Sequence, residues 1–178
     1  MRRFIAASLG ALALSGLIMN GAVAQVAPDP NNPNEAVPEK HAYTPYGEAI
    51  SLEQAKKVAD AALAEATKRG WQMCISVVSP SGELIVFEKM DQCQYASIQI
   101  SQHKARTAAR YRRPTVVFER LLGKGDFFSY LTTLDDVIAS RGGNPLVVNG
   151  KIIGAIGVSG GTGSQDDTIS QAGLKAVQ

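Results

Sequence analysis

The sequence predicts an α+β domain in which helices pack on an antiparallel sheet of about four to five strands. Two pairs of apolar segments are each joined by a short turn, Ser79–Gly82 in the first pair and Asn149-Gly150 in the second. Connections this short cannot form a parallel crossover, so both pairs are expected to be antiparallel. Helices are indicated by apolar residues at helical spacing, the first after a capping box at Ser51–Gln54.

Residues 1–24 have the composition of a secretory signal peptide. Arg2 and Arg3 precede an apolar run of small residues, and Ala22-Val23-Ala24 fits the A-x-A cleavage pattern. The run is short and interrupted by serine and glycine, which argues against a membrane anchor. We therefore expect a periplasmic or secreted protein whose mature chain begins at Gln25 and has no membrane span. The export route is left open.

The mature chain is expected to have a net charge near zero. Cleavage removes two arginines and no acids from 18 basic and 16 acidic side chains, which leaves 16 of each. This balance gives no support for a nucleic-acid or membrane-surface role. Arg110, Arg112 and Arg113 form a small basic cluster, which we interpret as a solvated helix end.

The mature chain divides into an arm and one domain. Residues 25–47 contain five prolines with asparagines between them, so this linker is expected to be extended and to bury little. Residues 48–178 have the length of a single domain with one core. Cys74 and Cys93 are the only cysteines, and export permits a disulfide worth roughly 3 kcal/mol, although a free buried thiol is an equal alternative for Cys74.

The first half of the domain predicts a helix, a hairpin and a second helix. The helix that opens at Ser51 ends at Gly70, and the strands are Trp71–Val78 and Glu83–Met90. The second helix runs from about Tyr95 to Tyr111, before Pro114. Three further segments follow and are less regular: Thr115–Leu122 as a helix, Gly123–Ser129 as a loop and Thr133–Ser140 as a short helix.

The last segment is rich in glycine. Asn149-Gly150 predicts a type I′ turn, and Gly154 and Gly157 in the strand Lys151–Ser159 indicate that another backbone or a flat ligand comes close. Gly160, Gly161 and Gly163 lead to a final helix for which Ser164 is the expected N-cap.

This turn matches neither common phosphate-binding pattern, and Asp166 and Asp167 in the first helical turn would repel a phosphate. We interpret it as a tight turn packed against the sheet. We interpret these two aspartates, and likewise Asp135-Asp136, as acids on a solvated helix face.

Short motifs spread along residues 48–178 resemble those of a known family. They are Ser51–Gly70, Val77-Val78, Ser81–Leu84, Lys89–Asp91, Ala96-Ser97, Lys104–Ala108, Gly142–Pro145 and Gly154–Gly161. On these motifs the chain resembles the GlcG/HbpS-like proteins, also found as the C-terminal domain of PduO-type proteins. The resemblance implies a compact α/β/α domain, homo-oligomers, haem binding in several members, and export of some. Other members are associated with glycolate or cobalamin metabolism. The chain departs from the family in having Ser79-Pro80 after the first strand and Lys89 where arginine is frequent.

Haem needs an axial ligand and a flat apolar slot. His103 is the best candidate iron ligand, and Lys104, Arg106 and Arg110 nearby could pair with the propionates. Met90 and Tyr95 are secondary ligand candidates. His41, the other histidine of the mature chain, is interpreted as a solvated residue of the arm.

We therefore favour an exported small-ligand-binding protein, a haem-binding accessory or a haem and redox sensor. The alternative is an enzyme or accessory factor for a small oxygenated metabolite, of the glycolate or cobalamin-linked kind, that uses Lys104, Asp91 and the glycine-rich turn. A third hypothesis is an assembly partner without a ligand. No H-E-x-x-H or C-x-x-C motif occurs, and two histidines in the mature chain leave little for a catalytic triad or a zinc site, so binding is favoured over catalysis.

Overall fold

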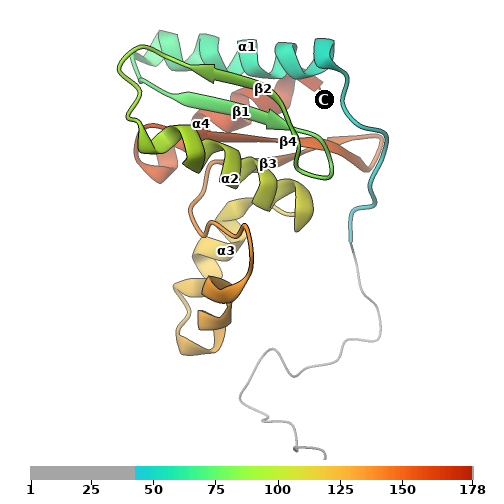
Figure 1. The fold of residues 1–178 in the computed structure, drawn as a ribbon, viewed down its shortest axis with the longest axis vertical. Coiled ribbons are helices and arrows are strands. Elements are labelled where there is room, and N and C mark those ends of the chain that lie inside the picture. The colour runs from blue at the N-terminus through green and yellow to red at the C-terminus, as the bar shows by residue number, and fades with distance from the viewer. Residues whose placement is uncertain (1–42, 178) are drawn as a thin grey trace, which may run out of the picture.

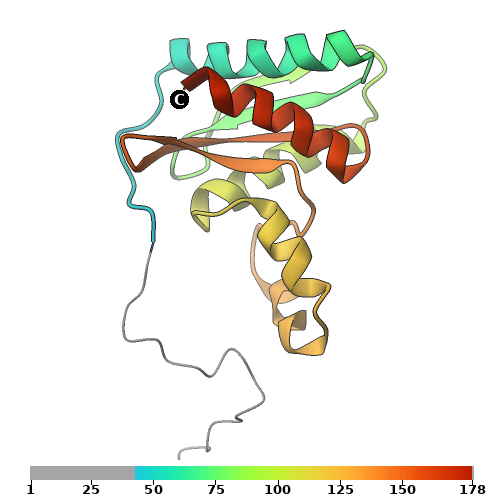
Figure 2. The same cartoon turned by 180° about the vertical axis from the view of Figure 1, so that it is seen from behind.

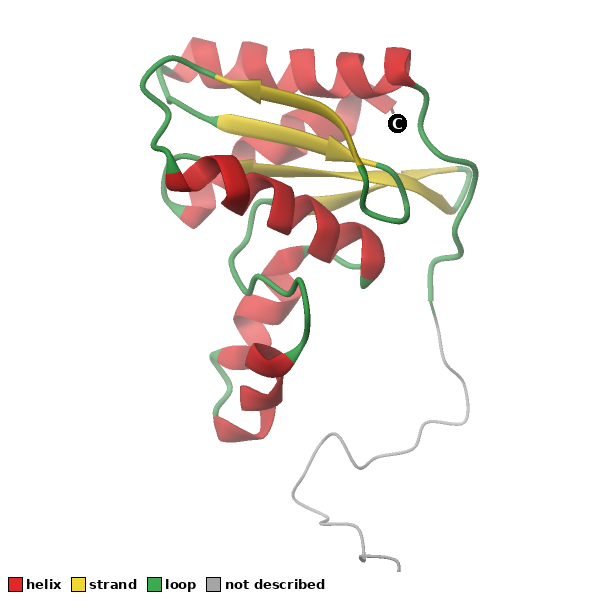
Figure 3. Cartoon of the chain, in the orientation of Figure 1, coloured by secondary structure: helices red, strands yellow, loops and turns green. Residues whose placement is uncertain are grey.

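The computed structural model describes residues 43–177 and contains one antiparallel sheet covered by helices (Figures 1 and 3). The predicted signal peptide, most of the predicted arm and His41 lie outside the described residues. In chain order the elements are α1 (Leu52–Arg69), β1 (Cys74–Val78), β2 (Leu84–Lys89), α2 (Ala96–Arg110), α3 (Thr115–Leu122), the 3₁₀ helix η1 (Asp126–Thr133), β3 (Gly143–Val148), β4 (Lys151–Ser159), α4 (Gly163–Leu174) and the 3₁₀ helix η2 (Lys175–Val177).

The sheet has four strands in the order β2-β1-β4-β3, and every neighbouring pair is antiparallel. The two hairpins form the outer pairs, as the short turns predicted, and β1 and β4 join them in the centre. In the second turn Asn149 and Gly150 both have positive φ, 50° and 71°. This is the requirement of a type I′ turn, so the prediction for this hairpin is confirmed.

The helices form a layer on each face of the sheet. α1 and α4 contact each other and cover one face, while α2 covers the other against β1, β3 and β4 (Figures 1 and 2). α3 and η1 project away from the sheet and have their own small core of Phe118, Phe128 and Leu131. The predicted α/β/α arrangement is therefore confirmed.

α1 begins and ends where its sequence signals predict. Ser51 and Gln54 form the reciprocal capping box, and Gly70 closes the helix in the left-handed conformation with φ 68°. Its buried face consists mainly of alanine, namely Ala55, Ala59, Ala62 and Ala66 beside Val58. Small side chains allow the helix axis to come close to the sheet and to α4.

α2 lies against two glycines that are neighbours across the sheet. Gly143 of β3 pairs with Gly157 of β4. A Cβ atom on Gly157 would clash with the backbone of Ser101 and Ala105, and one on Gly143 would clash with the Lys104 carbonyl. The close approach that these glycines indicate is therefore made by the backbone of α2 itself, and no flat ligand is needed to explain it.

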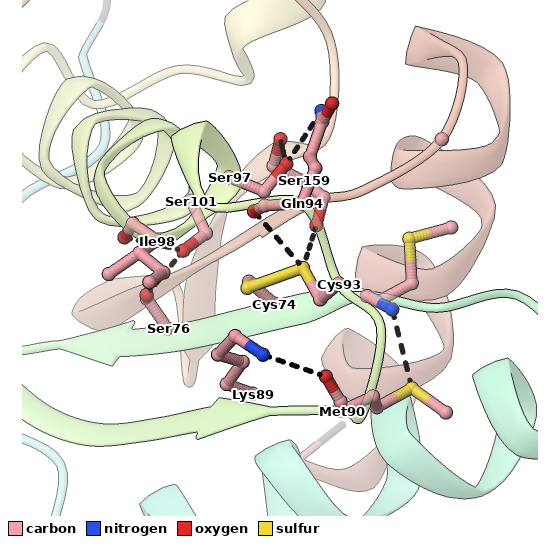
Figure 4. Close-up of a disulfide and its surroundings, with 12 residues drawn as sticks. Cys74, Ser76, Lys89, Met90, Cys93, Gln94, Ser97, Ile98, Ser101 and Ser159 are labelled. Carbon is pink, nitrogen blue, oxygen red and sulfur yellow. Dashed lines mark hydrogen bonds between the residues drawn. A yellow bond between two sulfur atoms is a disulfide. The ribbon is translucent and has the colours of Figure 1, made fainter.

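A disulfide joins Cys74, the first residue of β1, to Cys93 in the loop that enters α2 (Figure 4). The Cα atoms are 6.2 Å apart and the closed loop spans 19 positions. The two cysteines, whose pairing the sequence left open, are paired. The bond fixes the start of α2 to the centre of the sheet and, in the chain-entropy model, stabilises by roughly 3 kcal/mol.

The structure corrects two local expectations in the second half of the chain. The 3₁₀ helix covers Asp126–Thr133, where a loop was expected up to Ser129, and residues 134–140 do not form the predicted helix. The 3₁₀ helix forms at Asp126–Thr133 because Phe128 and Leu131 are buried there against Phe118 of α3. Packing between two elements leaves no helical periodicity in the sequence, so this position was not predicted.

The other corrections concern element ends. Thr162 caps α4, with Gln165 completing the box, so the cap lies two residues before the one expected at Ser164. The end of the predicted linker also belongs to the sheet: Gly47 N–H donates to the Ile152 carbonyl at 2.8 Å, and Ile152 N–H donates to the Pro45 carbonyl at 2.8 Å.

Gly157→Ala is expected to destabilise the protein by about 3 kcal/mol, because the added methyl group would clash with the backbone of α2 at Ser101 and Ala105. Gly123→Ala is the matched control. Gly123 has φ −67° and only ordinary contacts around its missing Cβ, so this change is expected to be neutral or to stabilise by up to about 1 kcal/mol. Urea unfolding measures both; equal effects of the two substitutions would contradict the close packing of α2.

Candidate functional site

The outer face of α2 brings three of the predicted site residues together. His103, Arg106 and Arg110 are three and seven positions apart, which places them along one side of the helix. His103 is half-buried and forms no hydrogen bond or ion pair with another residue of the described part of the chain. Its imidazole is therefore available as a ligand, with two guanidinium groups following it along the helix.

The two arginines of this face are already compensated by an acid. Asp136 pairs with Arg110 in a short contact, and its other oxygen lies 3.9 Å from Arg106. Arg110 Nε also donates to the Ser81 carbonyl at 2.8 Å. An anionic ligand at this face must therefore compete with Asp136, which the sequence did not identify as a site residue.

Asp136 is held in place by its own backbone. Thr107 Oγ1 donates to the Asp136 carbonyl and accepts a 3.0 Å hydrogen bond from Ile138 N–H. Asp136 has a positive φ of 57°, which is uncommon outside glycine. The interpretation of Asp135-Asp136 as acids of a solvated helix face is therefore wrong for Asp136, which lies in a turn tied to α2.

Lys104 points the other way, into the protein. Its Nζ lies 2.7 Å from Asp166 Oδ2, and only 1% and 4% of the two side-chain surfaces are exposed. Gly161 N–H donates to the second oxygen of Asp166 at 3.0 Å. Burial raises the pKa of the Asp166 carboxyl, while the charge of Lys104 acts in the opposite direction.

The position of Lys104 bears on both hypotheses that used it. Lys104 does lie beside the glycine-rich turn, as the enzyme hypothesis requires. Its ammonium group, however, is paired with Asp166 and does not reach the surface beside His103. Asp91 lies elsewhere, in a surface hollow beside Cys93 and Tyr95. The interpretation of Asp166 as a solvated acid is wrong, because its side chain is buried in the ion pair.

Further polar groups surround this ion pair at the start of β3 and α4. Asn144 Nδ2 donates to Ser170 Oγ at 2.6 Å and to Asp167 Oδ1 at 3.0 Å. At the edge of the group, Arg141 holds Glu119 through its backbone N–H at 2.8 Å and its Nε at 2.9 Å. These contacts place α3, β3 and α4 around the inner end of Lys104.

The two secondary ligand candidates lie at the opposite end of α2 from Arg110. Met90 packs against the main core, and its Sδ accepts a hydrogen bond from Met73 N–H at 3.4 Å. Tyr95 precedes the helix and is 86% exposed, with the Lys89 ammonium 6.0 Å from its ring centre. Met90 is thus engaged in packing, while Tyr95 is open but about 12 Å along the helix from His103.

The two largest surface cavities described lie near the C-terminal end of α2. One of ≈ 760 Å³ is lined by Tyr43, Thr44, Arg110, Tyr111, Arg112, Arg113 and Val117. One of ≈ 510 Å³ is lined by Tyr46, Gly47, Ala49, Pro80, Ser81 and Arg110. Both include Arg110 and neither includes His103, so a ligand held by His103 would lie on an open surface.

Between residues 43 and 177 no three acidic, histidine or cysteine side chains come together in a way that could hold a metal ion. None of the helices in the same range has the length and apolarity to cross a membrane.

Comparison with known proteins gives consistent matches over the whole domain. The model of the family described as "Haem degrading protein HbpS-like" matches residues 50–175. Protein GlcG of Escherichia coli is 39% identical over 110 residues, 62% of this chain and 81% of the relative.

Solved structures agree with these matches. A PduOC:heme complex has a TM-score of 0.68 at 25% identity, over 73% of this chain and 96% of that one. A double mutant of HbpS from Streptomyces reticuli has a TM-score of 0.69 at 26% identity, over 88% and 99%.

The Glu119–Arg141 contact predicts a specific pH dependence. Hydrogen bonds from Arg141 lower the pKa of Glu119 below its usual 4.5, so the contact stabilises the fold above that pH and is lost as the pH falls through the folded-state pKa. Glu119→Gln is expected to cost about 1 kcal/mol at pH 7, with the difference from wild type shrinking as the pH falls below 4.5 and through the lowered folded-state pKa. Urea unfolding across this range measures it. Glu48→Gln, at an exposed position, is the control and should show no such gap; a pH-independent gap for Glu119→Gln would contradict the assignment.

Proposed function

We propose that this chain, which belongs to the HbpS-like family, is a haem-binding accessory protein that holds haem on the outer face of α2. The observation that carries the proposal is the alignment of His103, Arg106 and Arg110 on one side of that helix, where the first two are half-buried and Arg110 is exposed. A relative of the same fold has been solved as a heme complex, which supports haem as the ligand class.

The residues of α2 fit the two chemical ends of haem. His103 supplies an imidazole nitrogen for the iron, and its freedom from other partners in residues 43–177 leaves that nitrogen open. Arg110 lies two turns further on, about 10 Å along the axis, and its fork suits a propionate carboxylate. Bound haem would supply a redox-active iron at this surface.

Binding at this face requires the arginines to exchange partners. Arg106 and Arg110 now share Asp136, so a propionate would replace or join that acid. The exchange keeps both guanidinium groups paired and involves no fully buried side chain. Lys104 is no longer needed as a propionate partner, because its ammonium is buried against Asp166.

The enzyme alternative has less support from the geometry. A lysine whose amine is buried in an ion pair has no free position for a small metabolite. The family description names haem degradation, which the same face of α2 could also support. Degradation differs from simple binding in a spectrum, because the absorption of the added haem would decay with time.

Export and homo-oligomerisation are part of the same proposal. The signal-like composition of residues 1–24 supports release of a mature chain beginning at Gln25 into the periplasm or medium. Homo-oligomers are supported by the family resemblance. Intact mass of the exported protein and light scattering test the two points; retention of residues 1–24, or a monomer at all concentrations, would contradict them.

Titration of the mature protein with hemin is expected to give a shifted Soret band that saturates at a fixed stoichiometry. His103→Ala is expected to remove the shift or to weaken binding at least about tenfold, because the iron loses its protein ligand. Arg110→Gln is expected to weaken binding less and to leave the band position unchanged, since it touches only the carboxylates.

Gln99→Ala is the matched control, because Gln99 is an exposed residue one turn before His103 and has no role in the proposal. It should titrate like the wild type. A Soret band in His103→Ala with unchanged position and affinity would exclude His103 as the iron ligand.

A further inference from the structure

The largest surface cavity described contains two arginines, Arg112 and Arg113, that have no role in the haem proposal. It lies where the chain enters the sheet beside the end of α2, and its ≈ 760 Å³ is within the usual range of small-molecule sites. Three of its lining residues are arginines, Arg110, Arg112 and Arg113, and none is an acid. The cavity therefore presents a concentrated positive charge inside a concave surface.

Arg112 is held in position by aromatic rings. Its guanidinium carbon lies 4.3 Å from the ring centre of Tyr46 and 4.7 Å from that of Tyr43. Stacking of this kind fixes the plane of the guanidinium and leaves its N–H groups available at the edge of that plane. Its backbone has a positive φ of 56°, at a cost of about 1 kcal/mol for a residue of this kind.

The ring that supports Arg112 is itself fixed. The Tyr46 hydroxyl lies 3.0 Å from the Ala109 carbonyl and 2.9 Å from the Arg110 carbonyl, to which it donates. The Tyr46 backbone bridges to Ile152 at the start of β4. Arg112, which lines the cavity, is thus held in place from behind before any ligand arrives, and this lowers the entropic cost of binding.

Arg112 and Arg113 lack the compensation that Arg110 has. Arg110 is paired with Asp136, whereas none of the ion pairs formed within residues 43–177 includes Arg112 or Arg113. Arg113 donates through Nε to the Tyr111 carbonyl at 3.1 Å and packs over Phe118, which orients its remaining N–H groups. Two oriented guanidinium groups at the same cavity, neither of them paired with a carboxylate of residues 43–177, fit an oxyanion.

We propose that this cavity is a second binding site, which shares only Arg110 with the His103 face, for a small organic anion with a carboxylate or phosphate group. Arg112 and Arg113 bind the oxyanion, and the side chains of Tyr43, Tyr111 and Val117 contact the organic part. The volume leaves room for a ligand larger than a bare inorganic ion. The basic cluster interpreted from the sequence as a solvated helix end is, on this proposal, a recognition site.

Calorimetric titration of the mature protein with benzoate, phenyl phosphate and the neutral isostere benzamide tests the proposal. At least one anion is expected to bind about tenfold or more tightly than benzamide, and the tighter of the two assigns the carboxylate or the phosphate as the recognised group. Arg112→Gln and Arg113→Gln are each expected to weaken that binding about tenfold, with melting temperatures confirming that the variants fold. If Arg112→Gln does not fold, Arg113→Gln decides alone.

Arg120→Gln is the matched control, since Arg120 is an exposed arginine of α3 that does not line the cavity. It removes the same charge and should leave binding unchanged. Anions that bind no better than benzamide would overturn the proposal, as would an equal loss in Arg120→Gln. The probes contain no porphyrin, so the result is independent of whether His103 binds haem.

Discussion

The buried ion pair between Lys104 and Asp166 is the contact on which the arrangement of the layers depends. Lys104 belongs to α2 on one face of the sheet and Asp166 to α4 on the other, and the two charges meet where β3 begins. Gly142 leaves the space for this crossing, because a Cβ atom there would meet both side chains. A buried pair of this kind costs desolvation when it forms, so its main consequence is that neither partner can be lost alone.

This crossing determines which residues of α2 remain for function. With Lys104 turned inward and the backbone of α2 seated on Gly143 and Gly157, the opposite side of the helix presents His103, Arg106 and Arg110. The disulfide holds the start of the same helix to β1. A rigid helix with a fixed polar face is a suitable support for a surface ligand, since its groups need little reordering to bind.

Much of the fold could be predicted because its signals are local. The Ser51 capping box and the Asn149-Gly150 turn each act within a few residues, and the capping box also belongs to a family motif. The glycines of β4 are visible in the sequence as well, although the backbone that Gly157 accommodates lies far away in the chain. The burial of Asp166 and the position of η1 could not be predicted, because each depends on a residue far away in the sequence, Lys104 and Phe118. For the candidate site, the sequence indicated the face of α2 but could not show which way Lys104 points.

A double-mutant cycle of Lys104→Met and Asp166→Leu, followed by urea unfolding, tests the structural role of this ion pair most directly. Each single variant leaves an unpaired buried charge and is expected to lose about 3–5 kcal/mol, or to fail to fold. The double variant removes both charges and is expected to be more stable than either single variant, so the two effects are strongly coupled. Effects that simply add, or single variants as stable as the wild type, would contradict the claim that Lys104 and Asp166 hold the layers together.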